Sequence, residues 1–206
     1  MFEEVIQKCI LQVRRECSFF GSLMLFAQIE KSNDLPTAAT DGRKIFFNEE
    51  FLNSLSSPQQ NALMLHEVLH MALLHVTRRQ SRDPYIWNIA ADIVVNDLIE
   101  RNTSFSLPEG AITDNRFQDK SVEYIYEALL KSKKKYNLVI SDILQPSNSN
   151  SDESNNDSKD VMEPLSQEET DEIESFWKDK MEILRNSSEH KPVSYTHLRA
   201  HETLGN

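Results

Sequence analysis

Glycine is scarce in this sequence, with 4 among 206 residues, and aromatic residues make up 8%. Sandwiches and barrels with many strands need frequent tight turns, which usually require glycine, so these fold classes are disfavoured. Hydrophobic residues still make up 39% of the chain, enough for one domain with a proper core. The composition therefore predicts a helix-rich α+β domain with a small sheet.

The sequence has only two cysteines, Cys9 and Cys17, and their spacing of eight places them more than two turns apart on a helix. A disulfide cannot span that distance, so we expect two reduced thiols in the core. The first twenty residues carry charges throughout and contain no clean apolar run, which argues against a signal peptide and a membrane span. We therefore expect no membrane partner and a cytoplasmic location.

Basic residues are fewer than acidic ones, with 22 Lys and Arg and 33 Asp and Glu, so the formal net charge is -11. Ten of these acids lie in residues 150–174, where Lys159 is the only base, so this segment alone carries -9. The rest of the chain is close to neutral and offers no surface for binding phosphates. Nucleic acid is therefore not expected as a partner.

Catalytic chemistry is indicated by His66-Glu67-Val68-Leu69-His70, which matches the pattern H-E-x-x-H. On a helix the two histidines lie on one face, with their Cβ atoms about 6 Å apart, so both imidazoles can bind one zinc ion. Glu67 then lies at the edge of the same site and can take a proton from a water molecule without being a ligand. The pattern is typical of a zinc hydrolase.

A catalytic zinc site needs a third protein ligand, and two residues are candidates. Asp92 is the stronger one, because it interrupts an apolar stretch and needs a polar or metal partner there. His75 follows His66 by nine residues and falls on the opposite face of a continuous helix, although it could bind if the helix ends just before it. Asn96, one turn after Asp92, could orient a ligand by a hydrogen bond.

A helix-start signal precedes the H-E-x-x-H motif, and another precedes Asp92. Ser57, Pro58 and Gln60 form a capping-box pattern at the start of the helix that carries the motif. Residues 83–84, Asp-Pro, give the same signal before the apolar segment 85–100. Two helices joined by a short connection usually pack side by side, so the motif and Asp92 are expected to meet. Further helices are expected at 3–16, 49–55, 121–134 and 167–185.

Two stretches indicate strands. Residues 44–48 are β-formers after a turn signal, which predicts a strand at the edge of the sheet. The apolar run 19–29 is ambiguous, and we expect a strand near its end. If the strand at 44–48 lies beside the motif helix, it could pair with an extended peptide. Tyr85 and Arg78 are weak candidates for stabilising an oxyanion.

Four blocks of the sequence occur in the order found in one known family: 39–48, 66–70 followed by His75 and residues 78–79, 87–92 followed by Asn96, and 121–126. Through these blocks the chain resembles the metallopeptidase domain of VWA-like bacterial proteins over about residues 1–130. The resemblance implies a zincin-like fold, zinc-dependent peptidase activity and a following VWA-like domain. Because this chain lacks such a domain, we expect it to be a fragment.

These observations divide the chain into four parts. Residues 1–140 are expected to form the zincin-like domain, and 141–166 an acidic disordered linker. Residues 167–191 should begin with a helix and belong to a truncated region. Residues 192–206 change character abruptly and look like a translated sequencing adapter, so we expect this tail to be non-native and exclude it from the fold.

The predicted function is a zinc-dependent peptidase, in which His66, His70 and Asp92 hold Zn²⁺ and Glu67 moves the proton. Its partner would be a peptide or protein substrate. The alternative is a catalytically silent zincin-fold module that binds or assembles with a VWA and ATPase system, its metal being absent or structural. A third alternative is a helical domain whose histidines are merely packed in the core.

Overall fold

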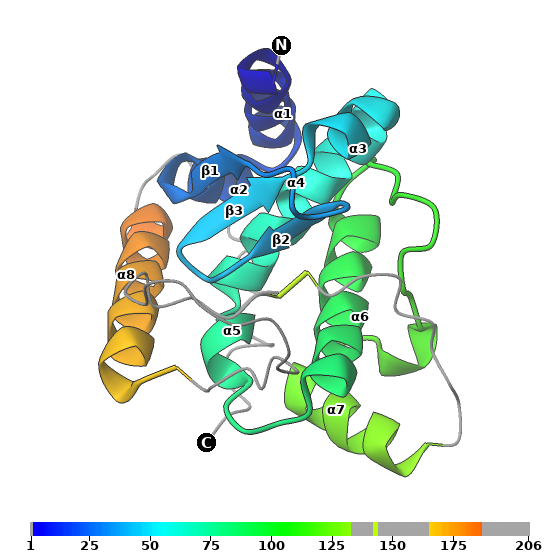
Figure 1. Cartoon of the computed structure of the whole chain (residues 1–206), viewed down its shortest axis with the longest axis vertical. Helices are drawn as coiled ribbons and strands as arrows, with labels where there is room; N and C mark the ends of the chain where they lie inside the picture. Colours follow the sequence, from blue (N-terminus) through cyan, green and yellow to red (C-terminus); the bar gives the residue numbers. More distant parts are fainter. Residues whose placement is uncertain (1, 133–141, 144–164, 187–206) are drawn as a thin grey trace, which may run out of the picture.

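The computed structural model describes residues 2–132, 142–143 and 165–186, and it confirms a helix-rich α+β fold (Figure 1). In chain order, the described elements are α1 (Phe2–Glu16), α2 (Ser18–Leu23), the 3-10 helix η1 (Met24–Phe26), β1 (Gln28–Lys31), β2 (Ala38–Thr40), β3 (Lys44–Phe47), α3 (Glu49–Ser54), α4 (Ser57–Ala72), α5 (His75–Arg78), α6 (Pro84–Asn102), η2 (Asn115–Phe117), α7 (Val122–Lys131) and α8 (Gln167–Asn186).

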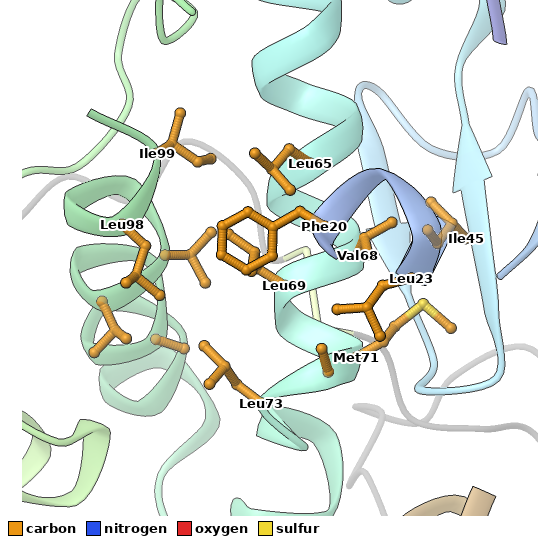
Figure 2. Close-up of a cluster of buried hydrophobic side chains, with 14 of the residues drawn as sticks. Phe20, Leu23, Ile45, Leu65, Val68, Leu69, Met71, Leu73, Leu98 and Ile99 are labelled. Atoms are coloured by element: carbon orange, nitrogen blue, oxygen red, sulfur yellow. The ribbon is translucent and has the colours of Figure 1, made fainter. Parts of the chain in front are cut away.

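Helices α4 and α6 form the centre of the molecule. Every residue of α4 from Asn61 to Ala72 is buried, as is every residue of α6 from Trp87 to Asn96. Neither helix has a solvent face over these spans, so neither sequence shows the polar stripe of a surface helix. The core beside them, shown in Figure 2, includes Phe20 and Leu23 from α2, Leu65, Val68 and Leu69 from α4, and Leu98 and Ile99 from α6.

The cap of α4 lies one residue earlier than predicted. Ser56 is the N-cap, and Gln59 closes the capping box by accepting hydrogen bonds from the Ser56 backbone N–H and hydroxyl. The prediction of Ser57 and Gln60 is wrong because the sequence offers the Ser-x-x-Gln pattern in two overlapping registers. In the register that forms, the Gln60 amide is left to donate to the Leu52 carbonyl at the end of α3.

The sheet has the strand order β1-β3-β2, with β3 parallel to β1 and antiparallel to β2. The prediction that residues 44–48 form an edge strand is therefore wrong, because β3 is the central strand. The edge nearest α4 belongs to β2, a three-residue strand whose two alanines are poor β-formers. Next to it, Ile143 makes an isolated parallel bridge with Thr40.

The strand expected near the end of 19–29 is β1, which begins at Gln28, while most of that run is helical. Ser121 caps α7 as predicted, by accepting a hydrogen bond from the Tyr124 backbone N–H. Cys9 and Cys17 are buried free thiols, as expected. None of the described helices is long and apolar enough to span a membrane.

Helix α8 confirms the helix predicted at 167–185, and it packs against α2, α4 and α5. Its Trp177 is buried and donates a hydrogen bond to the Gly42 carbonyl, with 2.9 Å between nitrogen and oxygen. Within the predicted linker, Asp142 and Ile143 lie against β2. Most of 141–166 and all of 192–206 lie outside the described residues.

Candidate metal centre

The two motif histidines lie one turn apart on the buried helix α4, as the spacing predicts. The Nε2 atoms of His66 and His70 are 2.9 Å apart. Helix α6 packs against α4 and brings Asp92 to the same point, where its Oδ1 lies 3.5 Å from His70 Nε2 and 3.8 Å from His66 Nε2. The structure therefore brings together the three residues expected to hold a metal.

A fourth group, the carboxylate of Asp142, joins this cluster. Its Oδ2 lies 2.8 Å from His66 Nε2 and 3.9 Å from His70 Nε2. One donor atom from each of the four residues lies within 4.8 Å of all the others. No spacing rule links Asp142 to the motif, but like Asp92 it is an acid near apolar residues, with Ile140 two positions before it and Ile143 directly after it.

The dimensions of the cluster fit a tetrahedral metal ion. Zinc binds imidazole nitrogen and carboxylate oxygen at about 2.0–2.2 Å, which places neighbouring donor atoms of a tetrahedral site about 3.3 Å apart. The separations between the donor atoms given above run from 2.8 to 3.9 Å and so bracket this value. Two imidazoles and two carboxylates are also a donor set that suits zinc.

Unsatisfied carboxylate oxygens provide a second test of the fit. Both side-chain oxygens of Glu67 and Oδ1 of Asp92 are buried and have no hydrogen-bond partner among the described residues. Burial, with Asp142 nearby, raises the pKa of both Glu67 and Asp92 well above the usual range for carboxyls. No described lysine or arginine forms an ion pair with Glu67, Asp92 or Asp142. A divalent cation and a water molecule would supply the partners that these carboxylates lack.

Asn96 determines which nitrogen of His66 faces the cluster. Its amide nitrogen donates to the Ile112 carbonyl, with a nitrogen–oxygen distance of 2.8 Å, so its amide oxygen is turned toward His66. That oxygen lies 2.9 Å from His66 Nδ1 and can only accept a hydrogen bond. In neutral His66 the hydrogen therefore sits on Nδ1, and Nε2 presents its lone pair to the cluster.

His75 lies beside His70 and outside the four-residue cluster, with 3.0 Å between the two Nδ1 atoms. The premise of a continuous helix is wrong, because α4 ends at Ala72 and Leu74 adopts the left-handed conformation with φ 57° and ψ 33°. Since Leu74 is not glycine, this turn could not be predicted from a local sequence signal. The break returns His75 to the motif face, where its Nδ1 can accept a hydrogen bond from His70.

Burial and the neighbouring charges shift the pKa values of the cluster residues in opposite directions. Burial alone would lower the pKa of His66, but its contacts with Asp142, Asp92 and Asn96 raise it above the ordinary value. Burial lowers the pKa of His70 to about 3. Burial alone would raise the pKa of Asp142, yet His70 and His66 hold it down at about 2. A proton on His66 Nε2 and a metal ion would occupy the same place and therefore compete.

A cavity of about 170 Å³ opens directly beside the cluster, and it is lined by Glu67 and by apolar side chains. A cavity of about 150 Å³ with apolar walls is large enough to hold a benzene molecule, so this one has room for one apolar side chain. Neither oxyanion candidate, Arg78 or Tyr85, lines the cavity. The apolar walls are formed by Ala38, Phe51, Ala62, Leu63, Leu107 and Ile112.

Over 126 residues, the chain is 28% identical to a protein of Thermotoga maritima that carries the name "Uncharacterized protein". The alignment covers 55% of this chain and 32% of that protein, so the chain spans about a third of the relative's length. No solved structure matches the chain. The sequence profile of a family described as "Putative metallopeptidase domain" matches residues 2–201, and the chain therefore belongs to this metallopeptidase-domain family.

Proposed function

We propose that the protein is a zinc-dependent peptidase that hydrolyses peptide bonds with an activated water molecule. The observation that carries the proposal is the carboxylate of Glu67, which is buried beside two imidazoles and two carboxylates and has no hydrogen-bond partner among the described residues. Such a group is costly to bury unless a ligand completes it. Water and substrate at a metal site would be that ligand.

His66 and His70 from α4 and Asp92 from α6 would hold the ion. Zinc bound there would supply a Lewis acid, which polarises the scissile carbonyl and makes water a stronger acid. Asn96 and His75 would keep the two imidazoles in the tautomer that presents Nε2 to the ion. Five of the six predicted site residues would therefore take part in binding the metal, and the sixth is Glu67.

Glu67 would move the proton. A general base works best when its pKa lies near the pH of the reaction, and burial raises the pKa of Glu67 in that direction. The carboxylate would first accept a proton from water as the water attacks the carbonyl carbon. It would then donate this proton to the leaving amine, which completes the cleavage of the peptide bond.

The surroundings favour an extended substrate with an apolar side chain. β2 is the edge strand beside α4, and an extended peptide can add to such an edge through main-chain hydrogen bonds. The largely apolar cavity next to the cluster would receive one side chain of that peptide. In this proposal the peptide pairs with the edge of β2 and not with the strand at 44–48, where the sequence predicted it.

Metal analysis combined with peptide cleavage tests the proposal. We expect about one zinc ion per chain in the wild type and in Glu67→Gln, and a loss of zinc in His66→Ala. Cleavage of a peptide library should fall by about 10²–10⁴-fold in Glu67→Gln, the usual contribution of a general base. Zinc binding that does not respond to His66→Ala would contradict the site, and equal cleavage by wild type and Glu67→Gln would contradict the mechanism.

One observation favours a second candidate, a catalytically silent module. Four protein ligands are typical of structural zinc sites, whereas catalytic sites keep one position open. In this case the metal would stabilise the fold, and the partner would be the VWA and ATPase system that the family resemblance implies. Zinc retained by both wild type and Glu67→Gln, with cleavage by neither, would support the module.

A further inference from the structure

We infer that Asp142 is a displaceable fourth ligand, with which the chain blocks its own metal site by occupying the place of the substrate. The inference rests on the proposed function and concerns its regulation. Its starting point is the excess of ligands, since His66, His70 and Asp92 already complete the protein part of a catalytic site. Asp142 fills the position that a catalytic site leaves to water.

The two carboxylates are held in very different ways. Asp92 lies in the middle of α6 between Ala91 and Ile93, which are 0% and 1% exposed, so it cannot leave the site without disrupting the core. Asp142 belongs to none of the described helices or strands. Its own contacts are polar and can be exchanged for contacts with water, although its departure also uncovers the neighbouring Ile143, which is 2% exposed and packs in the core.

Besides Asp92, whose side chain interacts with that of Asp142, three described groups hold Asp142. The Thr40 backbone N–H donates to its main-chain oxygen at 2.7 Å, and the Asn88 amide donates to Oδ1 at 2.8 Å. The third contact joins Oδ2 to His66 Nε2 at 2.8 Å. The side chain therefore reaches the metal cluster only while the main chain is docked on β2.

The docking position is the one proposed for the substrate. Ile143 pairs with Thr40 on the outer edge of β2 and is 2% exposed, as a bound peptide would be. At the same time, the Asp142 carboxylate contacts His66 and lines the same cavity as Glu67, so a carbonyl and a water molecule bound at the cluster beside Glu67 would take its place. A peptide and residues 142–143 cannot use the same strand edge together, so substrate binding requires Asp142 to leave.

The inference is tested with Asp142→Ala in the full chain, compared with Asp92→Ala and with the exposed control Asp179→Ala. Zinc affinity is measured by competition with a chelator, and the Co²⁺-loaded proteins are titrated with acetohydroxamate while their visible absorption is recorded. Asp142→Ala should retain one metal ion, with affinity reduced by at most about 100-fold, whereas Asp92→Ala should lose much more. Acetohydroxamate should bind Asp142→Ala at least about 10-fold more tightly than wild type, and peptide cleavage should increase.

Asn88→Ala provides a second variant that leaves every proposed ligand in place. It removes the hydrogen bond between the Asn88 amide and Asp142, so acetohydroxamate affinity should rise in the same direction but by less. Asp179→Ala should behave as wild type. If Asp142→Ala loses metal as completely as Asp92→Ala, or if acetohydroxamate binds wild type, Asp142→Ala, Asn88→Ala and Asp179→Ala equally, Asp142 is a permanent ligand and the inference is overturned.

These outcomes separate the inference from the proposed function. Tighter hydroxamate binding to Asp142→Ala without cleavage in any variant would support the displaceable ligand and contradict the peptidase. Cleavage by wild type that Asp142→Ala abolishes together with metal binding would support the peptidase and overturn the inference.

Discussion

At the scale of single residues, the position of one hydrogen on each imidazole determines whether the cluster can bind a metal. His66 and His70 face each other with Nε2, and each has a fixed partner at Nδ1 on the opposite side of its ring. Asn96 thus acts through His66, as a positioning residue. Its effect should be visible in metal binding before any activity is measured.

Asn96→Ala should weaken zinc affinity by about 10–100-fold, because His66 loses the acceptor that keeps the hydrogen on Nδ1. Asn96→Asp keeps an acceptor oxygen at this position and should restore most of the affinity. Competition with a chelator measures both variants. Equal affinities for wild type and Asn96→Ala would show that the hydrogen bond does not orient His66.

Zinc affinity should fall as the pH is lowered, because protons compete with the metal for the same atoms. The pKa of His66 is raised above its usual value, and so is that of Asp92, so both hold protons at a higher pH than ordinary side chains of their kind. Affinity should therefore begin to fall at a higher pH than it does for an unperturbed histidine site. Asp142→Asn removes a charge that raises the pKa of His66, so in this variant the loss of zinc affinity should begin at a lower pH. Chelator competition between about pH 8 and about pH 5 measures the zinc affinity of both proteins. An affinity independent of pH in this range would disprove the competition.

At the scale of elements, Phe51 on α3 lines the apolar cavity. Phe51→Ala should enlarge the cavity and raise kcat/KM for peptides with a large aromatic side chain relative to those with leucine by roughly 10-fold. Phe51→Leu should give a smaller shift in the same direction. Profiling with a peptide library measures the preference, and an unchanged profile would show that the substrate side chain does not enter this cavity.

The elements that the sequence predicted are those with local signals. Capping residues and long apolar runs revealed α4 and α6, and with them the meeting of His66, His70, Glu67 and Asp92. Two features without such signals were missed. The turn at Leu74 lacks glycine, and Asp142 reaches the cluster only through tertiary contacts with Thr40 on a strand of three residues.

At the scale of the whole molecule, α8 connects a distant part of the chain to the domain that carries the cluster. Trp177→Ala should lower the free energy of unfolding by about 3–5 kcal/mol, because it empties a large buried site and removes the hydrogen bond to Gly42. Trp177→Phe keeps most of the packing and should cost less, since it loses mainly a bond worth about 0.5–1.5 kcal/mol. Urea denaturation measures both. Full stability of Trp177→Ala would show that α8 does not contribute to the domain.

The burial of α4 and α6 on all sides has a consequence for the lifetime of the site. Amide hydrogens exchange with solvent through local opening only where an element can detach from its neighbours, and the central spans of these helices have no free face. In deuterium exchange, the amides around His66, His70 and Asp92 should therefore be among the slowest of the protein, whereas that of Thr40, whose bond depends on residue 142, should exchange faster. The three central ligands would keep their geometry for as long as the molecule stays folded.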